Sequence, residues 1–396
     1  MQALAMPASR YIFGTLPWYS VTMVSAIVVA ILLALREEKR RGLPKDTVID
    51  LALWLIPCGI VGARLYYVAF TWDLFRSRPL AILEIWKGGL AIYGALIAGV
   101  LAALVFSRRR KLSLFTLVDM VVPGLALAQC IGRWGNYFNM EAYGLPITNP
   151  AWQFFPAGVL IPENGQPVWH MATFFYESLW DLGVFIALQS LRKHCRRPGD
   201  LTCWYVVLYG AGRLIVEGLR MDSLMAADGS ARISQLVSVA GCLAVFALLC
   251  AYALRRAPRS AWLTGLGVGL VAGVLAWFLP APAEAFYGYR LAFCLKAGLM
   301  LGGFAALAVS NRFRRVVTCL PALLALCVEI ACYLHWSGSA ASPGLSTALC
   351  ALFSLCAIAA CAGGLSLCHA SRHASGKSAR YLTHLHQRRL PCPLHP

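Results

Sequence analysis

Long apolar runs separated by short connections constrain the fold of this chain more than any other feature of its sequence. Eleven such runs can be counted, and each is long enough to cross a hydrocarbon core about 30 Å thick as a helix. With 59% hydrophobic and only 13% charged residues, a chain of 396 residues is too apolar for one soluble core. The sequence therefore predicts an all-α fold, a polytopic transmembrane helix bundle. The predicted helices are 18–35, 48–70, 88–106, 112–131, 173–191, 201–219, 233–254, 262–279, 291–309, 316–334 and 345–367.

Lysine and arginine gather in alternate connections, which predicts the orientation of the helices. Basic clusters follow the first, third, fifth, seventh and ninth runs, and the tail from residue 372 on is basic as well. The N-terminus is therefore expected outside the cell membrane and the C-terminus in the cytoplasm. A net charge of +18 would suggest nucleic acid binding in a soluble protein, but these clusters lie between apolar runs. We expect contact with anionic membrane lipids and no nucleic acid partner.

The stretch Gly132–Gly144, which reads GRWGNYFNMEAYG, directly follows the fourth apolar run. It contains four polar side chains that lipid cannot solvate, namely Arg133, Asn136, Asn139 and Glu141. Because such groups need partners at membrane depth, we expect the stretch to break the helix and to line a wet cavity or a polar substrate site. The alternative is an extracellular loop that merely carries these polar side chains. Five prolines follow, so residues 132–171 are predicted to form an irregular extracytoplasmic head between helices 4 and 5.

Some arginines are exceptions to this distribution of positive charge, because they lie at or near the outer ends of predicted helices. Burying one in lipid costs at least ~2.5 kcal/mol on insertion scales, so a group at one level indicates an anionic partner. The planar fork of arginine suits phosphate, which favours an outer-leaflet phospholipid headgroup. The alternative is a set of internal ion pairs with Glu141, Glu177 and Glu217. The arginines are Arg64, Arg133, Arg213 and Arg220, and in the sixth predicted helix the spacing of Tyr209, Arg213, Glu217 and Arg220 places them on one face.

The third predicted helix begins with WKGGLAIYGALIAGV, and its glycines are typical of tight helix packing. Tyr93 lies about one turn below the outer surface, where a tyrosine usually anchors a helix at the membrane interface. Flanked by small residues, its hydroxyl could instead point into a cavity. The 15 cysteines show no CxxC pair and no Cys/His ligand spacing, so neither a metal site nor another cofactor is predicted.

These motifs resemble those of a known family. The stretch GRWGNYFNMEAYG is similar to the signature of the bacterial phosphatidylglycerol-prolipoprotein diacylglyceryl transferases, which reads roughly G-R-x-G-N-[FY]-x-N-x-E-x-x-G. The resemblance covers about residues 18–254. Further motifs follow in the order of the family: WYS at 18–20, GARLYYV at 62–68, GGLAIYGALIAG at 88–99, FYES at 175–178 and YGAGRLIVEGLR at 209–220.

The resemblance implies a core of about seven helices, residues 1–254, in the bacterial cytoplasmic membrane. Such an enzyme moves a diacylglyceryl group from phosphatidylglycerol to the lipobox cysteine thiol in the signal peptide of an exported prolipoprotein. A thioether forms and glycerol phosphate leaves, which is the first step of lipoprotein maturation. By motif, Arg133 resembles the phospholipid-binding arginine of the family. The other implied or candidate substrate-binding residues are Asn136, Asn139, Glu141, Gly144, Glu217, Arg220, Arg64 and Tyr209.

The candidate catalytic residues are Arg213, Tyr93 and Tyr19, the last matching the functionally important tyrosine of the family's first helix. Arg133 and Arg213 are candidates to stabilise the departing phosphate. Tyr93 stands where many members have histidine, so an imidazole base does not apply here. Either tyrosine would need a lowered pKa, because a value near ~10 makes a poor base at neutral pH. Arginine-rich surroundings could also lower the pKa of the thiol and make a dedicated base unnecessary.

Two other functions stay open on the sequence alone: a paralogous lipid transferase with another acceptor, and a non-catalytic phospholipid-binding or transport protein. Residues 255–368 would add about four accessory transmembrane helices without a catalytic motif. Within them, Lys296 and Glu329 lie at comparable depth and are predicted to pair. Residues 369–396 are predicted to form a disordered basic cytoplasmic tail.

Overall fold

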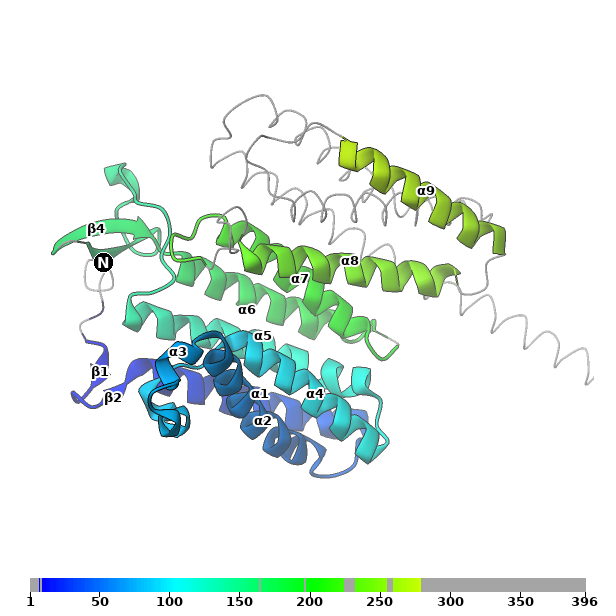
Figure 1. Ribbon diagram of the computed structural model, residues 1–396, viewed down its shortest axis with the longest axis horizontal. Helices are drawn as coiled ribbons and strands as arrows, with labels where there is room; N and C mark the ends of the chain where they lie inside the picture. Colours follow the sequence, from blue (N-terminus) through cyan, green and yellow to red (C-terminus); the bar gives the residue numbers. More distant parts are fainter. Residues whose placement is uncertain are drawn as a thin grey trace, which may run out of the picture. The chain divides into compact units, whose positions relative to one another are not determined.

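The computed structural model describes residue 7 and residues 9–163, 165–195, 197–223, 232–254 and 259–278, which are mostly helical (Figure 1). They form two compact units. The first unit contains Ser9–Asn139 and Asp181–Thr202, and the second contains Met140–Trp180 and the described residues from Cys203 on. The sheets are only two short hairpins within the described residues, so the predicted all-α, polytopic bundle is confirmed.

The first unit begins with a small hairpin, β1 (Tyr11–Ile12) and β2 (Leu16–Pro17), which leads directly into a helix. Four of its helices are long and apolar enough to cross a membrane. They are α1 (Trp18–Arg41), α2 (Thr47–Phe70), α4 (Ile92–Arg110) and α5 (Leu114–Asn139). Between α2 and α4 the chain forms three short pieces: α3 (Trp72–Phe75), η2 (Pro79–Leu83) and η3 (Ile85–Lys87).

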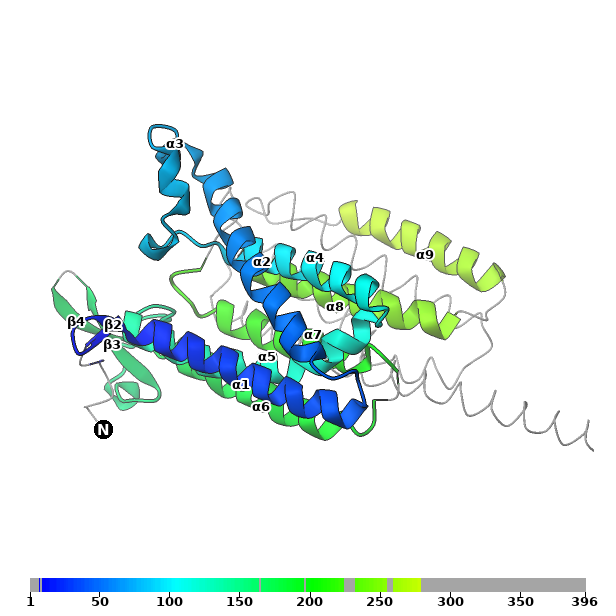
Figure 2. The same ribbon diagram turned by 90° about the horizontal axis from the view of Figure 1, so that it is seen from below.

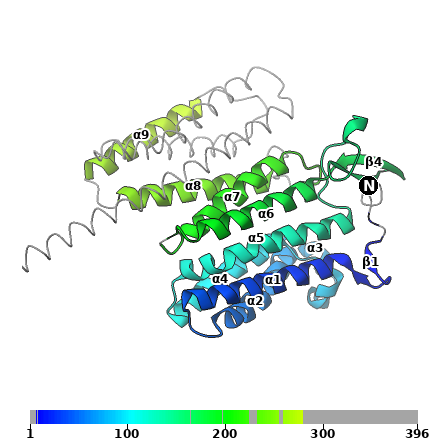
Figure 3. The same cartoon turned by 180° about the vertical axis from the view of Figure 1, so that it is seen from behind.

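Small residues allow these helices to pack in close pairs. Helix α1 lies along α5, as Figure 3 shows, and α2 lies against α4 (Figure 2). A Cβ atom added to Gly124 of α5 would lie 2.9 Å from the carbonyl oxygen of Ala30 in α1. Likewise, a Cβ atom on Gly94 of α4 would overlap the backbone of Gly62 in α2. Glycine at these positions therefore sets the distance between the helix axes.

One end of the first unit is held by charged side chains. The Glu38 carboxylate accepts a hydrogen bond from the Val48 N–H group at 2.6 Å and so caps the start of α2. Arg110 at the end of α4 pairs with Asp50 near the start of α2. Asp119 of α5 accepts hydrogen bonds at 2.8 Å from the backbone N–H groups of Gly199 and Thr202. The apolar core beside these contacts consists of Ala34, Val48, Leu51, Phe106, Leu117 and Met120.

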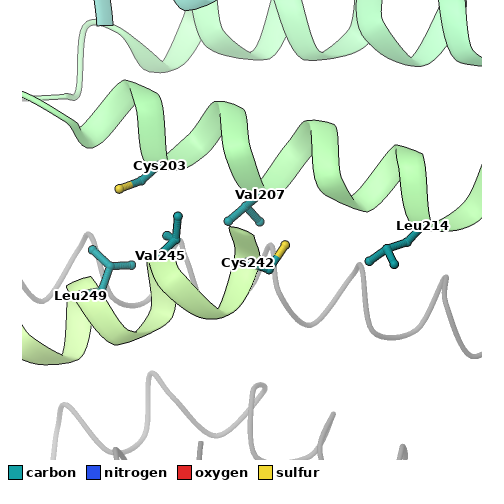
Figure 4. Packing of buried hydrophobic residues seen from close by; sticks show 6 residues of the cluster. All are labelled: Cys203, Val207, Leu214, Cys242, Val245 and Leu249. Carbon is teal, nitrogen blue, oxygen red and sulfur yellow. The ribbon is translucent and has the colours of Figure 1, made fainter. Parts of the chain in front are cut away.

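The second unit combines a hairpin with helices. Strands β3 (Gly158–Glu163) and β4 (Gln166–Met171) pair antiparallel, with Gly158 opposite Met171, and a short turn η4 (Pro150–Trp152) precedes them. Helix α6 (Thr173–Leu191) belongs to this unit up to Trp180 and α7 (Asp200–Glu217) from Cys203 on, and α8 (Ile233–Leu254) and α9 (Arg259–Phe278) follow. Buried residues of α7 and α8 form one apolar core (Figure 4): Cys203, Val207, Leu214, Cys242, Val245 and Leu249.

Several predicted boundaries are corrected by the structure. Helix α5 continues to Asn139, so the stretch that starts at Gly132 does not break the helix at once. Helix α4 begins at Ile92, because Gly88 and Gly89 adopt positive φ angles of 88° and 73° that an α-helix excludes. The predicted irregular head contains the β3–β4 hairpin. Helix α7 ends at Glu217 and leaves out Arg220. The last three predicted helices, the Lys296–Glu329 pair and the tail lie outside the described residues.

Candidate functional site

The last two turns of α5 carry the first group of predicted site residues. Arg133, Asn136 and Asn139 recur at every third position, so they span about 120° of the helix circumference. The helix passes through this polar segment because no proline interrupts it, although Gly135 costs about 1 kcal/mol relative to alanine. It ends where Met140 adopts a left-handed conformation with φ of 56°. The polar side chains of this segment are thus presented by a regular helix and not by a loop.

The start of α1 packs against this end of α5. A Cβ atom on Gly135 would lie 2.8 Å from Cδ2 of Tyr19 and 2.7 Å from Oγ1 of Thr22, so the Tyr19 ring rests directly on this glycine. The rings of Trp18 and Phe138 stack with their centroids 4.8 Å apart. The structure therefore places Tyr19, the predicted tyrosine of the first helix, against the signature segment. Tyr19 and Gly135 are 116 residues apart in the sequence.

Tyr93 lies in the first turn of α4, at the end that is remote from the basic cluster of this helix. The Ala91 N–H group donates a hydrogen bond to the Ala63 carbonyl of α2 at 3.1 Å. The neighbouring Gly94 touches Gly62. The position of Tyr93 is therefore set by the packing of α4 on α2.

Arg64, another arginine of the predicted group, is buried in the first unit near the end of α2. Its guanidinium group donates hydrogen bonds to four backbone carbonyls of the connection between α2 and α4: Ala81, Ile82, Gly88 and Gly89. Among the described residues it has no acidic partner. These contacts favour a role other than the direct binding of a substrate, which is developed below.

In the second unit, Arg213 of α7 lies between two carboxylates. It pairs with Glu177 of α6, and its Nη2 atom lies 2.6 Å from Oε2 of Glu217. The side chains of Glu177 and Glu217 are only 2% and 3% exposed, and that of Arg213 is 12% exposed. Charges buried to this degree are stable only as a matched set, so removing one partner is strongly destabilising. The internal ion-pair alternative thus describes the contacts of Arg213.

Arg220 lies three residues beyond the end of α7 and not on the helix face where the sequence placed it. Its Nη1 atom is nevertheless 3.6 Å from Glu217, and its Nη2 atom is 3.0 Å from Asp222. Tyr209, one turn before Arg213, stacks on Tyr205 with ring centroids 5.6 Å apart. The expected clustering of Arg213, Glu217 and Arg220 is therefore observed, with a different backbone path.

The chain around Gly144 is held between the end of α7 and the start of α6. The Gly144 N–H group donates to the Met171 carbonyl at 2.8 Å, and Nδ1 of His170 lies 2.8 Å from the Gly144 carbonyl. A Cβ atom on Gly144 would lie 2.7 Å from Cγ2 of Thr173 and 2.9 Å from the Leu219 carbonyl. Only glycine fits this position. Glu141, three residues earlier, is exposed.

The sequence reasoning missed two residues that support this segment. Ala142 adopts an unusual left-handed conformation with φ of 56°, and its N–H group donates to the Asp222 carboxylate at 2.8 Å. His170 is buried against Gly144, and its Nε2 atom lies 3.1 Å from Glu163. Asp222 could have been found from the sequence, because it lies two residues after Arg220. No signal of that kind exists for His170.

The predicted site residues divide between the two units. Tyr19, Arg64, Tyr93, Arg133, Asn136 and Asn139 belong to the first unit, and Glu141, Gly144, Tyr209, Arg213, Glu217 and Arg220 belong to the second. The signature stretch itself crosses the boundary, between Asn139 and Met140. In each unit the site residues form one group with identifiable supporting contacts.

Comparison with known proteins identifies the family to which this chain is related. A model of the prolipoprotein diacylglyceryl transferases matches residues 9–251, which is more than half of the chain and includes every predicted site residue. The chain belongs to the prolipoprotein diacylglyceryl transferase family. It is therefore a multi-pass membrane protein and a transferase. Helix α9 lies beyond the matched residues.

Individual members of the prolipoprotein diacylglyceryl transferase family are similar over most of their own length. The phosphatidylglycerol–prolipoprotein diacylglyceryl transferase of Listeria welshimeri serovar 6b is 44% identical over 230 residues, which cover 56% of this chain and 80% of the relative. The protein of the same name from Synechococcus elongatus is 44% identical over 252 residues, or 60% of this chain and 84% of the relative. That from Limosilactobacillus reuteri is 45% identical over 230 residues, or 57% and 82%.

Proposed function

We propose that this chain transfers the diacylglyceryl group of phosphatidylglycerol to the lipobox cysteine thiol of exported prolipoproteins, the first step of lipoprotein maturation. One observation carries the proposal: the family match spans residues 9–251 and contains all the candidate site residues of both units. The relatives named above are transferases that act on phosphatidylglycerol and a prolipoprotein. The lipobox cysteine is the nucleophile that this chemistry requires.

The reaction is a substitution at carbon. The cysteine sulfur forms a bond to the diacylglyceryl carbon that bears the phosphate, and the bond from this carbon to the phosphate oxygen breaks. Glycerol phosphate leaves with the electron pair, and the thiol proton passes to a base of the enzyme or, without a dedicated base, to solvent. The enzyme must therefore favour the thiolate and stabilise the charge on the leaving phosphate.

The residues divide these tasks in the proposed mechanism. Arg133 binds the phosphate of the phospholipid through charge-assisted hydrogen bonds, and Asn136 and Asn139 contribute polar contacts from the same two turns of α5. Arg213 is the second candidate to stabilise the leaving group. Tyr19 or Tyr93, in its deprotonated form, is the candidate base that receives the thiol proton.

The second group of residues shapes the substrate site in this proposal. Gly144 and Glu141 lie on the segment that α6, α7 and β4 hold in place. Glu217 and Arg220 continue the ion-pair network of Arg213, and Tyr209 stands one turn earlier on the same helix. Arg64 was grouped with them by sequence, and its role is treated separately below.

The proposed location is the bacterial cytoplasmic membrane, with the N-terminus outside and the C-terminus in the cytoplasm. The candidate residues of the first unit support this orientation, because they lie at the ends of α1, α4 and α5 remote from the basic clusters. Surrounding anionic lipids contact the basic clusters at the opposite ends.

Transfer of labelled diacylglyceryl from phosphatidylglycerol to a lipobox peptide by the purified chain tests the proposal directly. We expect transfer by the intact chain, its loss in Arg133→Ala, and its retention in Arg76→Ala, which changes an exposed arginine of the same unit. A truncation after Leu254 should keep activity, since the family match ends at residue 251. A folded preparation that binds phosphatidylglycerol without transferring it would refute the proposal in favour of another acceptor or a lipid-binding function.

A further inference from the structure

Arg64 makes an unusual set of contacts for an arginine within a membrane helix. Its Nε atom donates to the Ile82 carbonyl at 2.8 Å, and its Nη2 atom donates to the Ala81 carbonyl at 2.7 Å. Its Nη1 atom donates to the carbonyls of Gly88 and Gly89 at 2.7 and 2.9 Å. All four acceptors are neutral backbone groups that belong to the connection between α2 and α4.

The number of donors restricts what else this guanidinium group can bind. Arginine has five N–H donors, and the four contacts of Arg64 leave one. Bidentate binding of phosphate needs two adjacent N–H groups. Arg64 could therefore hold a phosphate in this way only by releasing at least one of these backbone carbonyls.

Two of the residues whose carbonyls accept from Arg64, Gly88 and Gly89, lie shortly before Tyr93, a candidate catalytic residue. Gly88 and Gly89 adopt positive φ angles, and both of their carbonyls point to the same nitrogen of Arg64. Two residues after Gly89, the Ala91 N–H group bonds to the carbonyl of Ala63, the residue before Arg64. Tyr93 follows in the first turn of α4.

A third contact completes the attachment of this turn to α2. Gly94 touches the backbone of Gly62 and the Cβ atom of Tyr66. Three consecutive positions of α2, Gly62, Ala63 and Arg64, thus hold the chain immediately before and after Tyr93. The side chain of Arg64 supplies the part of this attachment that lies outside α4.

We propose that Arg64 is a positioning residue, which fixes the connection between α2 and α4 and thereby the location of Tyr93, and that it does not bind the phospholipid phosphate. The proposal rests on the function proposed above, because Tyr93 is assigned to that reaction. It revises the sequence-based assignment of Arg64 to the substrate-binding group. Because the acceptors are backbone carbonyls, these hydrogen bonds require the directed N–H donors of the guanidinium group and not merely a positive charge.

Substitutions of Arg64 distinguish positioning from phosphate binding in the full-length chain. We expect Arg64→Gln to lower kcat about 10-fold or more, with the KM for phosphatidylglycerol changed by less than about 3-fold. Arg64→Lys should not rescue kcat, because one ammonium cannot reproduce four directed hydrogen bonds. If Arg64 bound phosphate, lysine would retain much of the affinity as a point charge and the KM of Arg64→Gln would rise, which would overturn the proposal. Arg76→Gln, at an exposed arginine of the same connection, is the matched control.

The two glycines provide an independent test if the Arg64 variants do not fold. A Cβ atom on Gly89 would lie 2.7 Å from Cε1 of Tyr67 and would also press on the Arg64 guanidinium, whereas one on Gly88 meets nothing within 4 Å. Both glycines have positive φ angles, so backbone strain is common to both substitutions. Gly89→Ala should therefore lower kcat several-fold more than Gly88→Ala. Equal effects would contradict the proposal.

Limited digestion with trypsin supplies a readout that needs no substrate. Loss of the Arg64 contacts should increase the rate of cleavage after Arg76 about 10-fold or more in Arg64→Gln and Gly89→Ala, relative to the unchanged chain, because opening of the connection makes the Arg76–Ser77 peptide bond accessible to the protease. Unchanged cleavage would show that Arg64 does not fix this segment. If the intact chain lacks transferase activity while cleavage responds as expected, the proposed function fails and the structural role of Arg64 stands.

Discussion

The contact between Tyr19 and Gly135 gives a sharp test of whether α1 and α5 build one site. Gly135→Ala adds a methyl group whose carbon would lie 2.8 Å from Cδ2 of Tyr19, where ordinary contact begins at 3.4 Å. The difference requires the ring to move by about 0.6 Å. Since a misplacement of about 1 Å can reduce catalysis 100-fold, we expect transfer to fall about 10-fold.

The effect on folding should be smaller than the effect on transfer. Overpacking a tight contact costs about 1–3 kcal/mol, and the replacement of glycine by alanine within a helix returns about 1 kcal/mol. A net loss of about 0–2 kcal/mol leaves a protein of ordinary stability folded. The reduced transfer in Gly135→Ala therefore reflects the displacement of the Tyr19 ring, and of Thr22 beside it, and not a reduced amount of folded protein.

The neighbouring glycine of the same motif provides the matched control. A Cβ atom on Gly132 would lie 3.5 Å from the sulfur of Met23, which is an ordinary contact. Gly132→Ala should therefore keep transfer within about 2-fold of the unchanged chain. Both variants are assayed for transfer of labelled diacylglyceryl, with thermal unfolding measured in parallel. The reasoning is refuted if Gly135→Ala retains full activity, or if Gly132→Ala loses as much.

Two further outcomes concern buried charges. Asp119→Ala removes the acceptor of the Thr202 N–H group and should lower the free energy of unfolding by about 1–3 kcal/mol. The KM for phosphatidylglycerol should not change, because Asp119 lies near the other end of α5. Unchanged thermal unfolding would contradict this prediction. Arg213→Gln should destabilise by about 3–5 kcal/mol, and adding Glu177→Gln should restore much of this loss by removing an unpaired buried charge. If Arg213 also contacts the leaving phosphate, the double variant regains thermal stability but not transfer. Recovery of both would assign Arg213 a purely structural role.

The positions of the helices could be predicted from the sequence, whereas several of their ends could not. Each of the first eight apolar runs corresponds to a helix, because a segment in lipid must satisfy its backbone hydrogen bonds internally. The sequence-based end of α5 is wrong because polar side chains after an apolar run predict that the helix stops. Polarity does not end a helix, and the conformation of Met140 does. The start of α4 depends on Gly88 and Gly89, whose positive φ angles the motif did not reveal.

The composition of the candidate site could also be predicted, but the partners of its charges could not. The sequence placed Arg213 near Glu217 through helical spacing, and the structure shows this pair. Glu177, the other partner of Arg213, is 36 residues away and was only one of three possible carboxylates. The acceptors of Arg64 are backbone carbonyls, which every residue possesses. A pattern of side chains therefore carries no information about them.

The contacts of Arg64, Arg213 and Arg220 limit how far each of them can bind a phosphate. Arg213 and Arg220 belong to a network with three carboxylates, Glu177, Glu217 and Asp222, so two positive and three negative charges give a formal net charge of −1. Arg213 can reach a departing phosphate only by giving up part of this pairing. Arg64 has one N–H donor left. The motif resemblance, and not these contacts, proposes phosphate binding for Arg133 on α5. Among single arginine variants, substitution at this position should weaken the binding of phosphatidylglycerol vesicles most.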